Sequence, residues 1–400
     1  MNSVAQVEKT ICTGCGLCAV VCPKGSISME QDSEGFLQPV LRQDSCVQCG
    51  LCLQGCPAVV GDLPKQEASG YFCCIAEDEE MLLRSSSGGV FGILGEYILQ
   101  QKGYVCGCVY DDNLKPVHIL SDKVEDVRRM YGSKYVQSEC YPCYPQIKEK
   151  LEAGVNVLFT GTACQVAALK SYLRKEYATL YTAEILCHGV PSPGLLQKYV
   201  AYLEKKLGGK VLDVQFRNKE RDGWGSEHRT CVVYRDKKCV VRKYRPLLPA
   251  YFSAFFYGVN LRYSCYSCRF ATPQRVADLT LGDYWGSWKK YANRFHEGIS
   301  VVSVNSQRGR MLENVVRDKC AFFETLTPEE AMWSNDNFEH PVPYPPERDG
   351  FYQEQTTYNG LWKKAYLSKT YRKKTLRSFY GALVPAKIRF GLHKMLIGRR

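Results

Sequence analysis

Residues 11–23 read "ICTGCGLCAVVCP", and residues 45–57 read "SCVQCGLCLQGCP". Each stretch places four cysteines at gaps of two, two and three residues and follows the last cysteine with proline. In bacterial [4Fe–4S] ligation with this spacing, three thiolates of one run bind one iron–sulfur cube, and the fourth binds a second cube. The two runs therefore predict two clusters and a ferredoxin-type module over residues 1–65.

The crossed ligation divides these eight cysteines into two sets. The first cysteine set is Cys12, Cys15, Cys18 and Cys56. The second cysteine set is Cys22, Cys46, Cys49 and Cys52. A disulfide framework or a pair of zinc knuckles is the alternative, but a zinc site built from two CxxC pairs gives no role to the third cysteine or to the Cys-Pro step.

Length and composition describe what surrounds this module. The chain has 400 residues, of which 45% are hydrophobic and 24% charged, as in ordinary globular proteins. One or two larger domains must therefore follow the module. The chain contains 21 cysteines, and residues 1–9 lack the apolar segment of a signal peptide, so we expect a reducing, cytoplasmic location.

The net charge of +12 is concentrated near the C-terminus. Residues 361–400 hold 12 Lys or Arg and no Asp or Glu. Apolar residues recur there near helical spacing: Leu376, Phe379, Tyr380, Leu383, Ile388, Leu392, Met395 and Leu396. We expect a basic amphipathic tail over residues 346–400 that contacts the inner membrane face or an acidic partner, or else a loosely packed terminal helix. Nucleic acid is not expected as a partner, because no basic and aromatic pattern occurs elsewhere.

The middle of the chain predicts an α/β (α+β) fold. A polar connector at residues 61–70 precedes a helix near residues 88–101 and a strand near residues 104–110. Strands then alternate with helices, which is typical of a mostly parallel sheet. The strands are expected at residues 155–159, 180–187 and 211–216, and the helices at residues 166–175 and 195–206. Shorter strands at residues 230–235, 238–243, 276–281 and 299–304 are expected as an antiparallel extension.

Four further cysteines are candidates for a third cluster. Cys164 follows one predicted strand, Cys187 ends the next, and Cys265 and Cys268 form a CxxC pair. Because adjacent parallel strands end at the same edge of a sheet, Cys164 and Cys187 are expected to be neighbours, and the CxxC pair can complete a [4Fe–4S] site. These four residues are called the third cysteine set. The "CYPC" pair at residues 140–143 is the rival candidate.

The remaining cysteines have no partner at a spacing suited to metal binding. We expect them to be small buried hydrophobic residues. They are Cys73, Cys74, Cys106, Cys108, Cys231, Cys239 and Cys320.

Seven motifs occur in the order found in the coenzyme F420 hydrogenase/dehydrogenase beta-subunit family. They are "SSSGGVFGIL", "YGSKYVQS", "VLFTGTACQVAALKSYL", "ILCHGVPSP", "FRNKERDGW", "SCYSCRF" and "DLTLGDYWG", spread over residues 70–320. The chain resembles the bacterial branch of this family, which carries an N-terminal dicluster ferredoxin and is often encoded near polysaccharide-biosynthesis and pyruvyltransferase genes. One departure is Ala163, where the family turn usually reads GTPCQ.

The resemblance implies a mixed α/β flavin-binding domain in two parts, residues 70–150 and 151–330. It also implies FAD near a [4Fe–4S] cluster, with electrons passing between flavin, clusters and a two-electron partner. Archaeal members use coenzyme F420. We therefore expect an FAD- and iron–sulfur-dependent oxidoreductase, with a role in polysaccharide biosynthesis as one possibility. Its expected partners are a ferredoxin or catalytic subunit and a hydride-carrying coenzyme or small metabolite. The alternatives are an electron-transfer subunit that has no substrate of its own and feeds a catalytic partner, or an assembly scaffold.

Candidate flavin contacts lie in a loop at a helix start and in a loop at a strand end, and Lys134 and Tyr135 are added because they are expected to set the charge near the flavin ring. They are Ser86, Ser87, Gly88, Gly89, Lys134, Tyr135, Thr160, Gly161, Thr162 and Gln165. Lys134 is expected to stabilise an anionic reduced flavin, and His188 to tune a cluster or relay a proton. The structural alternatives are an N-capped helix start at residues 85–89, an exposed loop lysine at position 134 and a histidine with no such role. Arg217, Lys219 and Arg221 either receive an anionic substrate or form a solvated charge run.

Overall fold

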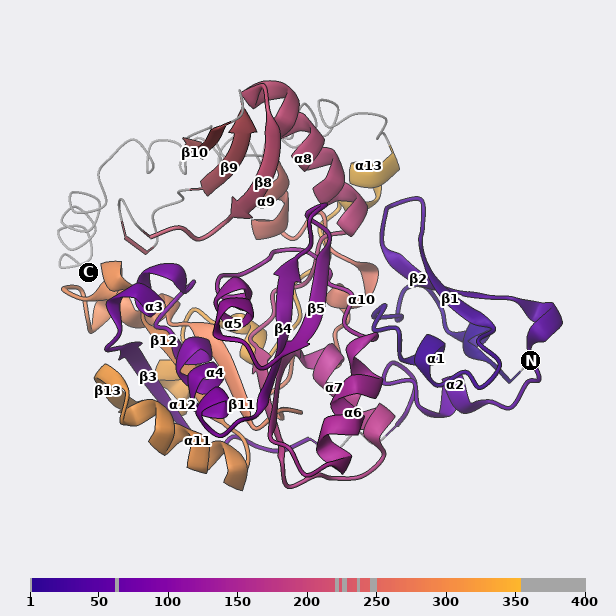
Figure 1. Ribbon diagram of the computed structural model, residues 1–400, viewed down its shortest axis with the longest axis horizontal. Coiled ribbons are helices and arrows are strands. Elements are labelled where there is room, and N and C mark those ends of the chain that lie inside the picture. The colour runs from indigo at the N-terminus through magenta and orange to yellow at the C-terminus, as the bar shows by residue number, and fades with distance from the viewer. Residues whose placement is uncertain are drawn as a thin grey trace.

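The computed structural model describes residues 2–61, 65–219, 223–224, 229–235, 238–244 and 250–353. Most of the predicted tail and Arg221 lie outside these residues. The described strands form sheets of two, three and eight strands. In Figure 1 the N-terminal module (residues 2–61, indigo) lies at one side of the eight-stranded sheet. The three-stranded sheet lies above the eight-stranded sheet in this view.

The N-terminal module consists of two cysteine loops, two short helices and a β-hairpin. Its elements are η1 (Val4–Gln6), α1 (Leu17–Val20), β1 (Ile27–Gln31), β2 (Leu37–Leu41), η2 (Gln43–Ser45) and α2 (Leu51–Gln54). Gly16 and Gly50 precede the two helices with φ of 72° and 77°, a conformation that glycine adopts without strain. A Cβ on Gly16 would lie 2.1 Å from the Tyr141 ring, so glycine also permits the module to pack closely on the rest of the chain.

The large sheet has the strand order β13-β3-β12-β11-β7-β6-β4-β5. Its strands are β3 (Gly70–Ala76), β4 (Tyr104–Tyr110), β5 (Pro116–Ser121), β6 (Val157–Thr162), β7 (Leu180–Ile185), β11 (Leu279–Asp283), β12 (Ser300–Val304) and β13 (Cys320–Leu326). The β4, β6, β7 and β11 strands are parallel, and the strands outside them pair antiparallel. The mixed α/β fold is thus confirmed, with the parallel strands at its centre.

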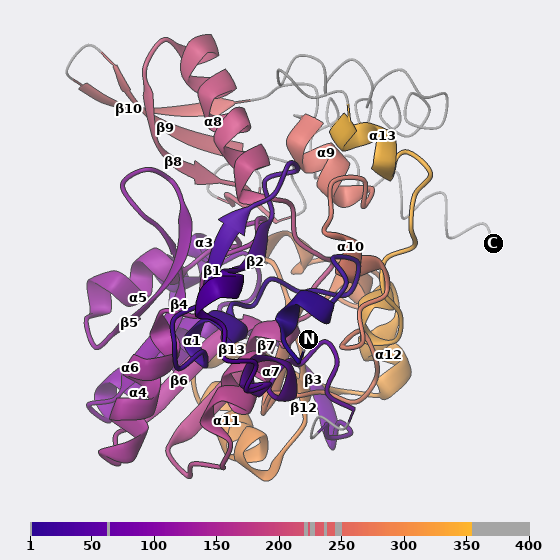
Figure 2. The same ribbon diagram turned by 90° about the vertical axis from the view of Figure 1, so that its right-hand side faces the viewer.

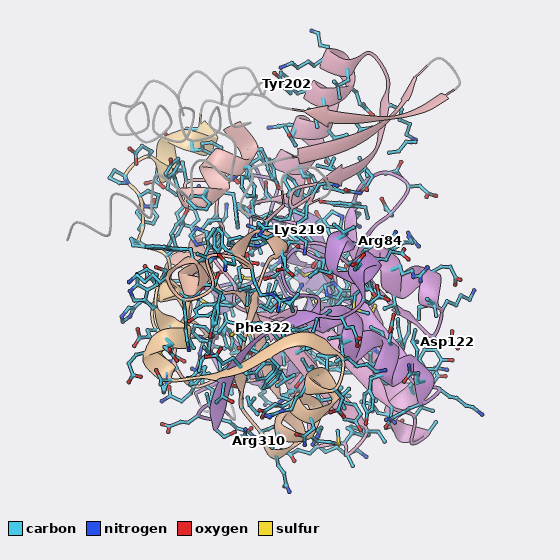
Figure 3. All side chains as sticks on the ribbon, turned by 90° about the vertical axis from the view of Figure 1, so that its left-hand side faces the viewer. Arg84, Asp122, Tyr202, Lys219, Arg310 and Phe322 are labelled. Atoms are coloured by element: carbon cyan, nitrogen blue, oxygen red, sulfur yellow. The ribbon has the colours of Figure 1, made fainter. Side chains whose placement is uncertain are left out.

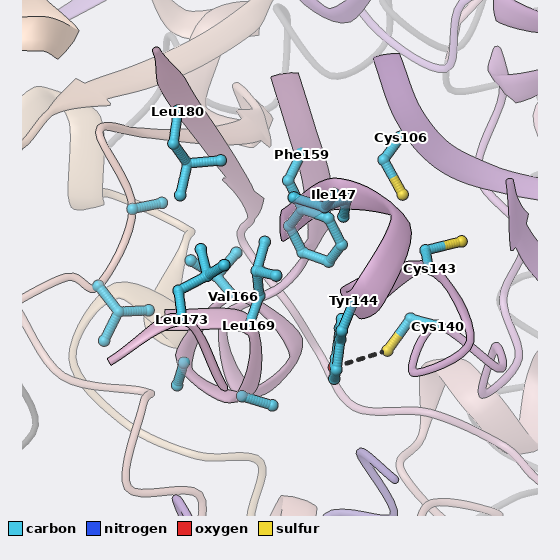
Figure 4. Close-up of a cluster of buried hydrophobic side chains, with 14 of the residues drawn as sticks. Cys106, Cys140, Cys143, Tyr144, Ile147, Phe159, Val166, Leu169, Leu173 and Leu180 are labelled. Carbon is cyan, nitrogen blue, oxygen red and sulfur yellow. Dashed lines mark hydrogen bonds between the residues drawn. The ribbon is translucent and has the colours of Figure 1, made fainter. Parts of the chain in front are cut away.

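Helices cover both faces of this sheet. They are α3 (Glu79–Arg84), α4 (Val90–Gln100), α5 (Val124–Met130), α6 (Cys143–Glu152), α7 (Ala163–Leu173) and α11 (Gln307–Arg317). Side chains of α6 and α7 pack on Val157 and Phe159, as Figure 4 shows for Phe159. Those of α4, α5 and α11 share a core with Leu158, which points to the opposite face. This alternation along β6 follows from the two-residue period of a strand.

The strand at residues 211–216 does not continue the parallel sheet as expected. It is β8 (Lys210–Gln215), which pairs antiparallel with β9 (Arg229–Arg235), and β9 pairs antiparallel with β10 (Lys238–Tyr244). In β8 only Val211 and Val214 are fully buried, whereas five of the six β7 residues are. Strands at the centre of a parallel sheet are buried on both faces, so a half-exposed strand suits a separate antiparallel sheet.

The remaining elements connect these layers. They are α8 (Pro193–Leu207), α9 (Ala250–Phe256), α10 (Tyr263–Tyr266), η3 (Trp285–Lys289), η4 (Phe295–Glu297), α12 (Pro328–Met332), η5 (Asp336–Phe338) and α13 (Arg348–Gln353). Within the described ranges, no helix is both long and apolar enough to span a membrane.

Candidate functional site

The second cysteine set lies around one pocket in the N-terminal module. All four of its cysteines line a pocket of about 320 Å³. Backbone amides point at two of the sulfurs, from Ser26 N to Cys22 Sγ at 3.3 Å and from Val4 N to Cys52 Sγ at 3.3 Å. Burial opposes ionisation of Cys22, but hydrogen bonds from backbone amides, led by Ser26, outweigh it and lower the pKa of this thiol. The pocket therefore gathers the four predicted ligands and already favours a thiolate.

The first cysteine set is also gathered in space. Burial raises the pKa of the Cys15 thiol to about 12, and repulsion from Cys56 and Cys12 adds to this increase. Burial likewise raises the pKa of Cys18, next to Cys15, Cys12 and Cys56. Four thiols this close cannot all ionise on their own, whereas iron makes their deprotonation favourable.

The third cysteine set lines a second pocket, of about 820 Å³ and partly open to solvent. Cys164 stands in the first turn of α7 directly after β6, and Cys187 follows the end of β7. Cys265 belongs to α10, and Cys268 follows it. Burial raises the pKa of Cys164 strongly, and the charges of Cys268, Cys187 and Cys265 act in the same direction. The structure thus brings four cysteines from three segments to one place.

The first cysteine set reaches the same pocket. Thr13, Gly14 and Cys15 line it together with the third cysteine set. Figure 2 shows the N-terminal module in front of α7 and β7. The second cysteine set lines a different pocket, and its Cys52 shares a buried cluster with Cys18 of the first set. The first set therefore adjoins both of the other sets.

The rival pair, Cys140 and Cys143, lies in the core at the start of α6. Cys140 Sγ is 3.1 Å from the Tyr144 hydroxyl, and Cys143 Sγ donates to the carbonyl oxygen of His118 at 3.1 Å. Neither residue lines the pocket of the third cysteine set.

The other cysteines occupy core or strand positions. Cys73, Cys74 and Cys106 are fully buried, while Cys108 and Cys320 are half-buried. The side chains of Cys231 and Cys239 lie outside the described residues. No group of three or more His, Cys, Asp or Glu in the described part converges as ligands of a single metal ion would. The thiolates of a cubane cluster bind separate iron atoms and therefore stand further apart.

The predicted flavin residues at positions 86–89 form a loop that is held from two other segments. Ser86 Oγ accepts a hydrogen bond of 2.6 Å from Ser133 N, and Ser87 Oγ donates to the Ile299 carbonyl at 2.8 Å. Gly88 N donates to Ser300 Oγ at 2.8 Å. Gly89 is the N-cap of α4, and no side chain caps that helix start. The serines therefore fix the loop instead of capping the helix.

The predicted flavin residues at the end of β6 and the start of α7 lie elsewhere. Thr162 and Gln165 line the pocket of the third cysteine set, and Thr162 Oγ1 is 3.1 Å from Cys164 Sγ. Gln165 Oε1 accepts from Thr162 N at 2.9 Å in a capping box. Thr160 Oγ1 donates to the Cys106 carbonyl at 3.2 Å. Gly161 lies between Thr160 and Thr162 on β6. The predicted contacts are thus divided between the pocket and the loop at residues 86–89.

Lys134 and Tyr135 sit between these regions. Lys134 Nζ donates at 2.8 Å to the carbonyl oxygens of Arg129 and Tyr131, and burial of the ammonium lowers its pKa to about 8. The Tyr135 ring packs on Phe255 at a centroid distance of 4.6 Å. Lys134 is therefore not a freely exposed loop lysine.

His188 lies beside the third cysteine set. It lines the same pocket, and its Nδ1 is 3.3 Å from the Asn337 side-chain oxygen. Its ring packs edge-on against Phe255.

The charges at residues 217–219 are not a solvated run. Lys219 is 5% exposed, and its Nζ donates to the carbonyl oxygens of Ser87 at 2.7 Å and Glu297 at 3.0 Å. Burial lowers its pKa to about 7. Arg217 pairs with Asp283 at 3.0 Å and lies over the Trp224 ring. Figure 3 labels Lys219 near the middle of the molecule, below the three-stranded sheet. The "FRNKERDGW" motif was the signal for this cluster, although its contact with the loop at residues 86–89 was not predictable.

Two family models match the chain. Residues 154–329 match the model for the C-terminal part of the beta subunit of coenzyme F420 hydrogenase/dehydrogenase, and residues 11–60 match the 4Fe-4S dicluster domain. The chain thus combines a dicluster domain with a region that is similar to the C-terminal part of this beta subunit. The beta-subunit match contains all four cysteines of the third set, and the dicluster match contains all eight of the other two sets.

Two curated relatives of the chain are archaeal. The chain is 23% identical over 175 residues to the F subunit of F(420)H(2) dehydrogenase from Methanosarcina mazei, which covers 41% of this chain and 49% of that protein. It is 25% identical over 190 residues to the coenzyme F420-dependent sulfite reductase of Methanocaldococcus jannaschii, which covers 46% of this chain and 29% of that protein. The chain thus spans about half the length of these relatives or less.

A solved structure also shows similarity. A chain from the F420-reducing [NiFe] hydrogenase complex of Methanosarcina barkeri aligns over 70% of this chain and 90% of its own length, at 19% identity and a TM-score of 0.47.

Proposed function

We propose that the chain is an iron–sulfur flavoprotein oxidoreductase that passes electrons between FAD and three [4Fe–4S] clusters. The observation that carries this proposal is the shared pocket, in which the third cysteine set meets Cys15 of the first set and its neighbours Thr13 and Gly14. Electron transfer between clusters requires them to be close, and two ligand sets around one pocket meet that requirement. The match to a dicluster domain and a beta-subunit family supports the same redox role.

The three cysteine sets suggest an order for the relay. The second set is the most accessible, because Cys49 is exposed and Val47, which follows Cys46, is 58% exposed. The first set adjoins the pocket of the third set. We therefore propose that an external carrier exchanges electrons at the second set, that the first set connects inward, and that the third set is nearest the flavin.

The flavin is proposed to contact the loop at residues 86–89 and the start of α4. Backbone amides at a helix start favour a phosphate or another anionic group, and the α4 start is not capped by a side chain. Lys219 and Lys134 lie beside this region with lowered pKa values, so each gains from an anionic neighbour. A bound flavin accepts hydride in a two-electron step and releases electrons singly, which suits one-electron clusters.

The roles proposed for protein groups are limited to binding and charge. Lys219, held by the Ser87 carbonyl, would keep a positive charge beside the loop when an anion binds there. Lys134 would do the same from the segment that Ser86 holds through Ser133. His188, which lines the pocket next to Cys187, would tune the third cluster or carry a proton.

The two-electron partner is proposed from the relatives. One is named as part of an F(420)H(2) dehydrogenase and the other as an F420-dependent reductase, so a deazaflavin or another hydride-carrying coenzyme is the first candidate. A metabolite reduced in polysaccharide biosynthesis, with ferredoxin as the electron source, is a second candidate. Peripheral membrane contact through residues 361–400 remains a proposal from their charge.

The main competing proposal is an electron-transfer subunit that feeds a catalytic partner. Anaerobic titration of the purified protein with reduced coenzyme F420, NADH or NADPH distinguishes the two. Stoichiometric bleaching of the flavin followed by cluster reduction supports an enzyme with its own hydride donor. Reduction by ferredoxin with no response to any hydride donor supports the subunit. If neither a flavin nor a cluster responds to any donor, both proposals fail.

A further inference from the structure

Arg262 is buried between the N-terminal module and the pocket of the third cysteine set. It is 1% exposed and directly precedes α10. Its Nε donates to the Cys12 carbonyl at 2.6 Å, and its Nη1 donates to the Leu37 carbonyl at 2.9 Å. Its Nη2 has no hydrogen-bond partner among the residues that the structure describes, and the side chain lines the pocket. A buried arginine that leaves one donor unused beside a cavity has room for a further partner.

The same residue connects the two cysteine sets through hydrogen bonds. Cys12 belongs to the first set, and the Cys12 carbonyl accepts from the Arg262 side chain. The Arg262 carbonyl accepts from the backbone amide of Cys265, in the third set, at 3.0 Å. Arg262 therefore joins the two sets. Its side chain forms a hydrogen bond with a residue of the first set, and its backbone forms one with a residue of the third set.

The charge of Arg262 has no acidic partner in the described part of the chain. Its hydrogen-bond acceptors are carbonyl and amide oxygens, namely those of Cys12, Leu37 and Gln137. Arg275 lines the same pocket but is paired with the buried Glu184 at 3.5 Å. A buried charge without a counter-charge is unfavourable, so the guanidinium favours a negative group in the pocket. Four thiolates around an iron–sulfur cube supply such a group, and each added electron makes it more negative.

We propose that Arg262 is a positioning residue for electron transfer between the first and third clusters. It fixes the gap between the two ligand sets, and its uncompensated charge raises the reduction potentials of both clusters. The proposal rests on the proposed function, because it requires clusters at both sets. It assigns two separable roles to the side chain, one geometric and one electrostatic.

Two substitutions separate these roles. Arg262→Gln removes the charge, whereas Arg262→Lys keeps the charge and loses the planar fork that bonds two segments at once. Arg348→Gln is the control for weaker attachment of the N-terminal module, because Arg348 is also a buried arginine that joins the core to this module, through Glu34, but does not line the pocket. Its potentials are measured under conditions in which the variant is folded. Each variant is purified anaerobically, analysed for iron, and titrated under EPR detection.

For wild type we expect three clusters, two of which broaden each other's EPR signals by spin–spin interaction. Arg262→Gln should lower the midpoint potentials of the clusters at the first and third cysteine sets and leave that of the cluster at the second set unchanged. Arg348→Gln should leave all three midpoint potentials unchanged. Arg262→Lys should keep the potentials near wild type while weakening the spin–spin interaction. Should the glutamine variant lose iron, the lysine variant decides alone, and an unaltered interaction in it overturns the proposal. Unchanged potentials in an iron-replete Arg262→Gln variant also overturn it. A wild-type protein without a third cluster would instead refute the proposed function.

Discussion

The Nζ atom of Lys219 donates a hydrogen bond of 2.7 Å to the carbonyl oxygen of Ser87, which precedes it by 132 residues. A second hydrogen bond of 3.0 Å goes to the Glu297 carbonyl. Both acceptors are neutral, and the side chain is 5% exposed, so burial lowers the pKa of Lys219 from 10.5 to about 7. A lysine that is easily neutralised therefore lies under the loop proposed to bind the flavin.

This lysine predicts a pH-dependent stability. Between pH 7 and 10.5 the unfolded chain keeps a proton on Lys219 that the folded chain loses. The free energy of unfolding therefore rises with pH in this window, by at most about 1.4 kcal/mol per pH unit. Lys219→Met removes this contribution. We expect the melting temperature of the wild type, minus that of the variant, to increase from pH 7 to pH 9 in flavin-free protein. A difference in melting temperature that stays constant with pH would refute a lowered pKa of Lys219 in the folded protein.

A substitution of Gly88 tests whether the loop at residues 86–89 contacts the flavin. A Cβ there would lie 2.1 Å from the Cys74 carbonyl oxygen and 2.7 Å from Ser300 N, both backbone atoms that cannot move aside cheaply. Gly88→Ala should displace the loop, cost about 1–3 kcal/mol of stability and lower flavin content. Iron content should stay at the wild-type level, because no cysteine of the three sets lies in this loop. Gly350→Ala, where a Cβ meets nothing within 4 Å in the described part of the chain, is the control. A wild-type flavin content in the Gly88→Ala variant would show that this loop is not part of the flavin site.

The third cysteine set predicts an iron stoichiometry. Cys164→Ser or Cys265→Ser should lower the iron content by about four per chain and remove one EPR signal, since each cube holds four irons. Cys143→Ser, in the rival pair, should leave the iron content unchanged because Cys143 Sγ faces the His118 carbonyl in the core. If the Cys143 variant loses iron and the Cys164 variant does not, the rival pair holds the cluster.

The contact between Arg348 and Glu34 predicts how firmly the N-terminal module is attached. Arg348 is fully buried, and its guanidinium bonds both carboxylate oxygens of Glu34, at 3.1 and 2.7 Å. Arg348→Met leaves a largely buried carboxylate unpaired, which should cost about 3–5 kcal/mol. Combining it with Glu34→Gln should recover part of this loss. Anaerobic melting temperatures and the rate of proteolytic release of the module measure the effect, and equal stability of the single and double variants would contradict it.

The cysteine motifs were predictable because their information is local. Three ligands of one cluster lie within seven residues, so spacing alone indicates the two ferredoxin-type clusters, and the dicluster match agrees with that prediction. The meeting of Cys164 and Cys187 in one pocket follows from a simple rule, that neighbouring parallel strands end at one edge. Their role as cluster ligands stays a prediction.

The parts that sequence could not indicate depend on distant contacts. Arg262 bonds the Cys12 carbonyl across 250 residues, and no local pattern marks that pairing. Lys219 looked like one charge in a solvated run, because sequence does not show that the run folds beneath Ser87. The strand β8 followed the strand and helix alternation but is half-exposed, and its place in a separate sheet depends on its pairing with β9.

The most direct test of the proposed function is the metal and flavin content of the protein, purified without oxygen and loaded with iron and sulfide. We expect about twelve iron atoms per chain, from three four-iron cubes, with matching sulfide, one flavin, and EPR signals from three clusters after reduction. A colourless protein, or one that holds zinc and no iron, would contradict it.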